Sequence, residues 1–282
     1  RLNSAPATTL DWAGFFNIST AVFVDSFSVL AQDTTPAGIA FNTDGTKMFV
    51  IGQNGNNVNE YILSTEFDVS TASFVDSFNV SAQEIFAHGI AFNTDGTKMF
   101  ITGYEGDDVN EYTLSTGFDV STASFVDSFS VSAQDTAPVG LAFNTNGSKM
   151  FVLGSVNRSV FEYALSTGFD VSTASFTDAF SVAGQETQPQ GIAFNTDGTK
   201  MFIVGSIGDD VNEYALSTGF DVSTAAFTDA FSVAAQETTP RAITFNANGS
   251  KMFVVGSGSD AVNEYNITPT SLQLGTGSFA SA

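Results

Sequence analysis

Short apolar runs separated by turn-forming residues recur along the chain at a fixed spacing. In the first complete unit, runs rich in Phe, Val, Ile and Tyr cover residues 38–41, 47–51, 58–63 and 74–80. Their lengths and residue types, with Asp44-Gly45 between the first two, predict short β-strands joined as successive hairpins. No stretch of the sequence has convincing helical periodicity. The chain is therefore predicted to be all-β.

The unit of four strands repeats without insertion or deletion. Its phenylalanine at position 41 returns at 92, 143, 194 and 245, in steps of 51 residues. Four-stranded units of about 40–50 residues are typical of the blades of a β-propeller. The run Met48–Ile51 has no polar alternation, which predicts a strand buried on both faces between neighbouring blades. The first strand alternates small and large residues, and small residues suit the crowded axis of a ring.

The two ends of the repeat region predict that the ring closes. The chain opens with a fourth-strand sequence, Phe23–Val29, and completes its last unit on a third strand, Val262–Ile267. Pairing of these two segments would complete the last blade and leave no open end face. We expect one five-bladed β-propeller over residues 16–267, with four antiparallel strands per blade, an N-terminal extension at 1–15 and a tail or linker at 268–282. The alternative is an open solenoid or part of a larger ring.

The repeat also resembles a known family. Pro36–Val50 is similar to the YVTN/NHL-like β-propeller repeat, whose core reads Pro-x-Gly-Ile-Ala, then Asp-Gly, then an apolar strand. The fuller unit, with Phe67–Phe74, resembles repeats in uncharacterised surface and phage structural proteins of marine microbes. The resemblance covers residues 16–267 and implies the propeller fold. It indicates little about function, because such propellers serve as scaffolds, binding modules and occasionally enzymes.

Charge and composition narrow the range of partners. The chain carries 30 acidic and eight basic residues, for a net charge of −22, and has no cysteine. A field of this sign repels nucleic acid and anionic membrane surfaces, so neither is an expected partner. The absence of cysteine excludes disulfides and thiolate metal sites. No apolar run approaches the roughly 20 residues of a membrane-spanning helix, so membrane insertion is not expected.

Comparison of the five units predicts one constant face and one variable face of the ring. The loops between strands one and two, such as 42–46, and between strands three and four, such as 67–72, hardly change and share a face by strand parity. Loops on the opposite face differ from unit to unit. The position just before the first strand holds five different side chains: Ala37, His88, Val139, Gln190 and Arg241.

Variation confined to one face predicts an asymmetric ligand site at the mouth of the central channel. Arg241, His88 and Gln190 would supply polar contacts, and Phe86 and Tyr104 would supply stacking surfaces. The expected ligand-binding set is completed by three residues of the neighbouring variable loops: Gln53, Glu105 and Arg158. Neutral drift of exposed loops is the alternative explanation of the variation.

The remaining ionisable residues of the repeat are predicted to have structural roles. His88 is the only histidine, and no acid or nucleophile is singled out as its partner, so we expect no catalytic residue. Lys47 and its equivalents are expected to be counter-charges within each blade. An acid follows each fourth strand: Asp33, Glu84, Asp135, Glu186 and Glu237. These carboxylates could hold calcium, but free alternation of Asp and Glu favours local capping of each loop. No cofactor is therefore expected, with structural calcium as the alternative.

These features lead to a functional expectation. The chain is expected to be a non-enzymatic binding or adhesion module, outside a cell, on its surface or on a virion, that recognises a glycan or surface polymer. The alternative is a structural subunit of a filament or virion, whose variable loops contact other protein subunits. An enzyme of the lactonase or lyase kind is the least supported class, because it needs inward-facing metal ligands or a His–acid pair.

Overall fold

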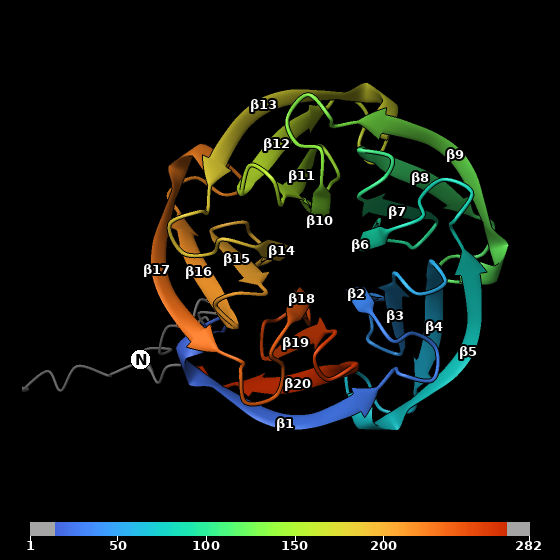
Figure 1. Ribbon diagram of the computed structural model, residues 1–282, viewed down its shortest axis with the longest axis vertical. Coiled ribbons are helices and arrows are strands. Elements are labelled where there is room, and N and C mark those ends of the chain that lie inside the picture. The colour runs from blue at the N-terminus through green and yellow to red at the C-terminus, as the bar shows by residue number, and fades with distance from the viewer. Residues whose placement is uncertain (1–14, 270–282) are drawn as a thin grey trace, which may run out of the picture.

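The computed structural model describes residues 15–269 and forms a ring of five four-stranded antiparallel sheets around a common axis (Figure 1). Blade 1 comprises β2 (Pro36–Phe41), β3 (Lys47–Gly52), β4 (Asn57–Leu63) and β5 (Ala72–Asn79). Blade 2 comprises β6 (Ala87–Phe92), β7 (Lys98–Gly103), β8 (Asp108–Leu114) and β9 (Ala123–Ser130). Blade 3 comprises β10 (Pro138–Phe143), β11 (Lys149–Gly154), β12 (Ser159–Leu165) and β13 (Ala174–Ser181).

The last two blades follow the same order from the axis outward. Blade 4 comprises β14 (Pro189–Phe194), β15 (Lys200–Gly205), β16 (Asp210–Leu216) and β17 (Ala225–Ser232). Blade 5 comprises β18 (Pro240–Phe245), β19 (Lys251–Gly256), β20 (Ala261–Ile267) and β1 (Ala21–Ser28). A single 3₁₀ turn precedes each outer strand: η2 (Ile18–Thr20), η3 (Val69–Thr71), η4 (Val120–Thr122), η5 (Val171–Thr173) and η6 (Val222–Thr224). Within residues 15–269, no helix has the length and apolar composition needed to cross a membrane.

The predicted five-bladed propeller is confirmed, including its closure. Strand β1 pairs antiparallel with β20 from Ala21 opposite Ile267 to Ser28 opposite Ala261. Figure 1 shows the two ends of the described chain side by side in this blade. The strand boundaries differ only slightly from the predicted ones: the inner strand begins two residues earlier, at Pro36 in blade 1, and the outer strand at Ala72. The predicted terminal segments 1–15 and 268–282 lie almost wholly outside the described residues.

The second strand of each blade forms the apolar centre of the ring wall. Met48, Phe49, Val50 and Ile51 are fully buried, as the continuous apolar run predicts. The two faces of this strand serve different neighbours. Phe49 and Ile51 pack with residues of blade 2, whereas Met48 and Val50 pack with residues of blade 5. Each fully buried side chain of this size contributes about 1.5–3 kcal/mol, and this contact recurs between every pair of blades.

The alternation of small and large residues on the inner strand lets neighbouring blades approach each other at the axis. A Cβ on Gly38 would lie 2.3 Å from the carbonyl oxygen of His88 in the next blade. Only glycine leaves room for this approach. On the other side of the strand, Ile39 packs into the cluster shared with blade 5. The crowding that the sequence predicts at the axis is therefore a contact between adjacent inner strands.

The constant face consists of local turn chemistry. Asp68 accepts a hydrogen bond from the Ser70 amide and caps the 3₁₀ turn η3. The ring of Phe67 covers Gly45, whose φ of +74° and missing Cβ both require glycine. The Phe67 amide donates to the Gly45 carbonyl at 2.9 Å, which joins the two loops of this face. These contacts explain why the residues of the constant face recur in every unit.

A lysine–glutamate pair links each blade to the next. Lys98 Nζ lies 2.7 Å from Glu111 Oε1 in its own blade and donates to the Phe169 carbonyl of blade 3 at 2.6 Å. Glu111 Oε2 accepts from the Val171 amide of blade 3 at 3.1 Å. The expected counter-charge role of the lysines is thus confirmed, with Glu111 and its equivalents as partners. These glutamates were not predicted from the sequence, although they recur at a single phase of the repeat: Glu60, Glu111, Glu162, Glu213 and Glu264.

The link is weaker where the N-terminal segment closes the ring. Lys200 pairs with Glu213 at 2.9 Å and donates to the Phe16 carbonyl at 2.9 Å. Glu213 Oε2, however, is buried and has no hydrogen-bond partner within residues 15–269. The four other glutamates each accept a backbone amide with this oxygen. The junction between blade 4 and the closing segment therefore lacks one charge-assisted hydrogen bond.

This difference gives a paired stability test. Glu111→Gln should lower the free energy of unfolding by about 1–2 kcal/mol more than Glu213→Gln. In Glu111→Gln, the side-chain NH₂ group must face one of two donors, either the Lys98 ammonium or the Val171 backbone amide. In Glu213→Gln, the NH₂ group can take the place of Oε2, which faces no donor. Urea denaturation of the two variants measures the difference. An equal loss, or a larger loss for Glu213→Gln, would contradict this account of the link.

Candidate functional site

Five inner-strand positions form a ring at the variable-face end of the channel. They are the second residues of β2, β6, β10, β14 and β18: Ala37, His88, Val139, Gln190 and Arg241. The sequence analysis placed them before the first strand, whereas the structure includes them in it. Ala37 separates Arg241 from His88, and Val139 separates His88 from Gln190. Arg241 reaches His88 across Ala37, and the Gln190 side chain interacts with His88 across Val139.

Arg241 and His88 meet although they are 153 residues apart in the chain. Arg241 Nη1 lies 3.4 Å from His88 Nε2, and Arg241 Nε donates to the Ser257 hydroxyl at 3.3 Å. A guanidinium has only donors, so His88 Nε2 must accept and its proton must be on Nδ1. The histidine therefore orients the guanidinium through a lone pair.

His88 is held in its neutral form. Its side chain is fully buried, and desolvation, followed by the positive charge of Arg241, lowers the pKa of His88 to about 3. The Val139 backbone and the Gln190 side chain oppose this shift without overcoming it. The mouth of the channel thus holds one cation and one neutral imidazole at physiological pH.

Tyr104 and Gln190 complete a four-residue cluster, which we call the mouth cluster: His88, Tyr104, Gln190 and Arg241. The rings of Tyr104 and His88 lie 5.6 Å apart in an edge-to-face arrangement. Burial raises the pKa of Tyr104, and its electrostatic neighbours include Arg241 and Gln190. Gln190 is 6% exposed. Within residues 15–269, its Oε1 and His88 Nδ1 have no hydrogen-bond partner in good geometry.

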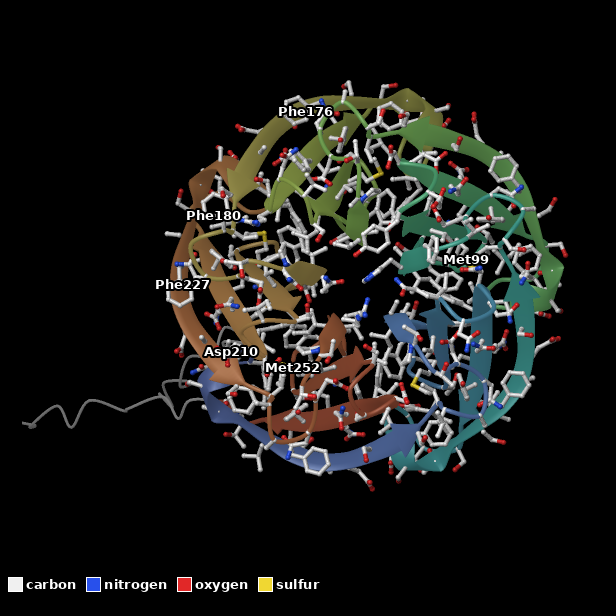
Figure 2. All side chains as sticks on the ribbon, viewed as in Figure 1. Met99, Phe176, Phe180, Asp210, Phe227 and Met252 are labelled. Atoms are coloured by element: carbon white, nitrogen blue, oxygen red, sulfur yellow. The ribbon has the colours of Figure 1, made fainter. Side chains whose placement is uncertain are left out.

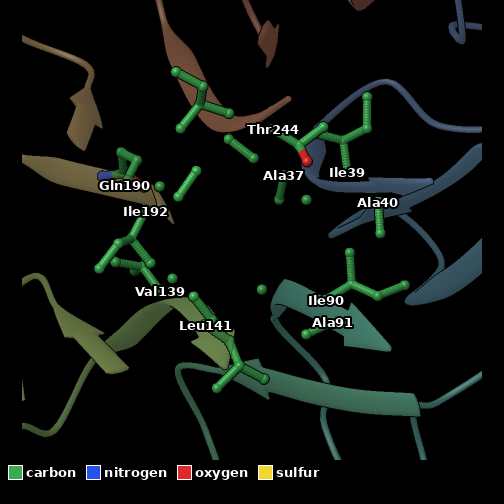
Figure 3. A pocket seen from close by; sticks show the side chains of 18 of the residues that line it. Ala37, Ile39, Ala40, Ile90, Ala91, Val139, Leu141, Gln190, Ile192 and Thr244 are labelled. Atoms are coloured by element: carbon green, nitrogen blue, oxygen red, sulfur yellow. The ribbon is translucent and has the colours of Figure 1, made fainter. Parts of the chain in front are cut away.

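A cavity of about 210 Å³ lies on the axis and is lined by all five inner strands. Figure 3 shows its largely aliphatic wall, including Ile39, Ile90, Leu141 and Ile192, with Gln190 as a polar lining residue. Gln190 is therefore the member of the mouth cluster that borders this apolar cavity.

Four of the predicted ligand-binding residues do not join the mouth cluster. Phe86 is 45% exposed, and Glu105 and Arg158 are also exposed. Glu105 contributes its backbone amide to Glu84, and the Arg158 carbonyl accepts from the Val182 amide. Gln53 is partly buried, and its amide donates to the Thr35 carbonyl. The structure thus brings together His88, Tyr104, Gln190 and Arg241 from the predicted set of eight.

The acids that follow the outer strands tie neighbouring loops together, which is the local role favoured by the sequence. Glu84 is fully buried and accepts from the Phe86, Glu105 and Gly106 amides at 2.8, 3.2 and 3.3 Å. A Cβ on Gly103 would lie 2.4 Å from the Glu84 carboxyl carbon, so the strand must end in glycine there. The other four acids make equivalent contacts. Within residues 15–269, no three His, Cys, Asp or Glu side chains are grouped as a metal site requires.

Two aspartates of the neighbouring loops each have a carboxylate oxygen that lacks a hydrogen-bond partner. Asp209 and Asp260 have left-handed backbones, and each has a buried Oδ1 without a partner within residues 15–269. Asn56 occupies the equivalent position in blade 1 and accepts from the Ala87 amide, but proline replaces that alanine in every other blade. Burial is the largest cause that raises the pKa of each carboxyl, and Glu237 adds repulsion to both.

No protein-family model and no curated protein sequence matches the chain. Its fold is similar to that of a functionally unknown protein from Desulfotomaculum acetoxidans, with 15% identity, a TM-score of 0.51 and coverage of 84% of this chain and 70% of that one. A protein from Lactobacillus plantarum gives 14% identity, a TM-score of 0.52 and coverage of 84% and 70%. A "putative 6-phosphogluconolactonase" from Bacteroides uniformis has 14% identity and a TM-score of 0.51, with coverage of 81% of this chain and 65% of that one. Identities this low show the fold alone.

The single histidine makes the mouth cluster observable by NMR. We expect His88 to remain the neutral Nδ1–H tautomer from pH 5 to pH 8, because burial and Arg241 lower its pKa to about 3. Arg241→Ala should raise that pKa, but not to the ordinary value, since desolvation is the larger cause. A ¹⁵N-imidazole pH titration checks both results. An imidazole that titrates near pH 6.5 in the unchanged protein would contradict the burial of His88.

The two unsatisfied aspartates predict a stability gain. A raised folded-state pKa means that the contribution of each carboxyl to stability is present below its unfolded pKa of about 3.9 and is lost as pH rises through the folded pKa. Asp209→Asn and Asp260→Asn should therefore each raise the free energy of unfolding at pH 7 by about 0.5–1 kcal/mol. This gain should shrink as pH falls toward about 3.9.

Asp107→Asn is the matched control for these two substitutions. Asp107 has the same left-handed backbone, with a φ of +49°, and also faces a proline, but none of its oxygens is among the buried unpartnered atoms. Urea denaturation at pH 4 and pH 7 separates the charge effect from the preference of asparagine for this backbone. A gain for Asp107→Asn equal to the others would show that the backbone, and not the buried charge, is responsible.

Proposed function

We propose that this protein is a non-catalytic binding module that recognises a glycan or surface polymer at the mouth cluster. The observation that carries the proposal is the convergence of His88, Tyr104, Gln190 and Arg241 on one end of the channel. These residues come from three blades, and they occupy positions at which the five units differ. Ring symmetry alone brings the inner-strand positions to one axis, and the Arg241–His88 contact at 3.4 Å and the edge-to-face packing of Tyr104 on His88 are what join these residues into one cluster.

The chemistry of the mouth cluster suits a sugar. A sugar ring offers hydroxyl groups that donate and accept hydrogen bonds, and an apolar face that packs on an aromatic ring. Arg241 supplies donors, Gln190 supplies an acceptor without a partner, and the half-buried Tyr104 supplies an aromatic surface. The acidic exterior and the resemblance to repeats of surface and virion proteins support an extracellular, cell-surface or virion location.

The state of His88 supports a binding role over catalysis. A general base needs an accessible lone pair, a pKa near the working pH and a reacting partner within reach. His88 is fully buried, its pKa is lowered to about 3, and its Nε2 faces the guanidinium of Arg241. The similarity to the Bacteroides uniformis structure concerns the fold and so does not favour a lactonase.

One observation favours the structural-subunit alternative. A belt of exposed phenylalanines follows the outer strands, one per blade, with exposures of 39–46%: Phe23, Phe74, Phe125, Phe176 and Phe227. Figure 2 shows Phe176 and Phe227 on the outer rim. Exposed aromatic rings on edge strands are a feature of surfaces that contact other proteins. In that case the outer rim, and not the channel mouth, would be the working surface.

A glycan array probed with the intact protein and two variants tests the proposal. Tyr104→Ser copies the residue that blades 3, 4 and 5 carry at this position, so we expect it to fold normally. It should weaken binding of the recognised glycan by roughly fivefold, because an aromatic contact contributes about 1 kcal/mol. Phe227→Ser is the control for loss of an aromatic ring on the rim and should leave binding unchanged.

The proposal fails if no glycan binds, or if Tyr104→Ser binds as well as the unchanged protein. Light scattering of the same three proteins addresses the alternative. Ordered assembly that depends on Phe227 and not on Tyr104 would favour the structural subunit.

A further inference from the structure

We propose that the glycan recognised at the mouth cluster is acidic, and that Arg241 holds the carboxylate of a uronate residue. The inference rests on the proposed binding function and adds the chemical class of the ligand. Its basis is the unpaired, partly buried guanidinium of Arg241 in a chain where carboxylates greatly outnumber cations.

Arg241 is partly buried and has no counter-ion within residues 15–269, whereas Arg158, which also forms no ion pair there, is exposed. Every ion pair formed within residues 15–269 uses a lysine, each with a glutamate oxygen at 2.6–2.9 Å. Arg241 forms none of them, and its side chain hydrogen-bonds to the Ser257 hydroxyl and the uncharged His88 ring. A partly buried cation without a counter-charge is unfavourable in a folded protein. An anion that enters from solvent would provide the missing charge.

The contacts of Arg241 orient its guanidinium without neutralising it. Ser257 takes the Nε proton and His88 takes one Nη1 proton. A guanidinium has five N–H donors, so one on Nη1 and two on Nη2 remain. Donors on the two Nη atoms form the fork that binds a carboxylate through two parallel hydrogen bonds. His88 is thus a positioning residue that holds the fork in place.

The surrounding charge favours a carboxylate over a phosphate. The net charge of −22 repels any anion, and it repels a doubly charged phosphate about twice as strongly as a singly charged carboxylate. At physiological salt this repulsion is largely screened beyond about 8 Å, which weakens it for both anions and leaves the phosphate the more strongly repelled of the two. A uronate also keeps the hydroxyl groups and ring face that suit Gln190 and Tyr104.

A trigalacturonate and its fully methyl-esterified form are matched probes, because esterification removes the charge and keeps the sugar. Isothermal titration should show that the acid binds roughly 10- to 100-fold more tightly than the ester. The ¹⁵N-imidazole signals of His88 should shift on binding, which reports directly on the mouth cluster. Arg241→Gln should remove the preference for the acid.

Two features of the chain allow the effect of the Arg241 contact to be separated from effects on folding and net charge. Gln190 occupies the equivalent position in blade 4, so Arg241→Gln introduces a side chain that this strand position already accepts. Arg158→Gln lowers the net charge by the same amount, at an exposed site outside the mouth cluster. It should keep the full preference for the acid. An equal loss in the two variants would show that net charge, and not a contact with Arg241, governs binding.

The outcomes separate this inference from the proposed function. If neutral glycans bind with sensitivity to Tyr104→Ser and the ester binds as well as the acid, the carboxylate assignment is wrong and the binding function stands. If a sulfated galactan binds more tightly than trigalacturonate through Arg241, the assignment to a carboxylate is also wrong. If neither acidic nor neutral glycans bind, both proposals fail.

Discussion

The pairing of β1 with β20 joins the two ends of the chain in one sheet, and the rest of the structure depends on it. With that sheet complete, every blade has two neighbours, and the apolar second strand of each blade is covered on both faces. Without it, blade 5 would lack its outer strand and the pairing edge of β20 would be unsatisfied. Closure also defines the axis, because five inner strands surround one channel only when the ring is complete (Figure 1).

Two kinds of contact hold adjacent blades together, and they differ in how far they tolerate change. The apolar contacts are non-directional and recur with small substitutions, such as Ile51, Thr102 and Leu153 at one position. The lysine–glutamate link is directional, because both charges and two backbone groups of the next blade must be in register. The lysine and the glutamate of this link are therefore the same in all five units. The incomplete link at Glu213 marks the place where a separate N-terminal segment replaces the usual covalent connection.

Because the five blades are nearly identical, the few positions at which they differ are informative. The five acids that follow the outer strands tie loops of the variable face together, and the lysines are used in the links between blades. At the mouth cluster, Arg241 forms no ion pair within residues 15–269, and His88 Nδ1 and Gln190 Oε1 are two of the nine buried polar atoms without a hydrogen-bond partner there. A symmetrical ring creates a site of this kind with few changes, because five copies of one position already face a common axis. Substitutions at those copies alter the site and leave the blade contacts intact.

Much of this protein could be predicted from the sequence alone, because its determinants are periodic. The spacing of 51 residues, the apolar run Met48–Ile51 and the phase of the two ends specify blade number, burial and closure, since each is a property of local pattern and strand parity. The variable position that holds His88, Gln190 and Arg241 was visible for the same reason. Which side chains meet was decided by the tertiary structure. Small neighbours at Ala37 and Val139 leave space across the axis, and the inner strand includes this position, so its side chains are close-packed and partly or fully buried. Exposure of Phe86, Glu105 and Arg158 depends on loop conformation, which the repeat pattern does not encode.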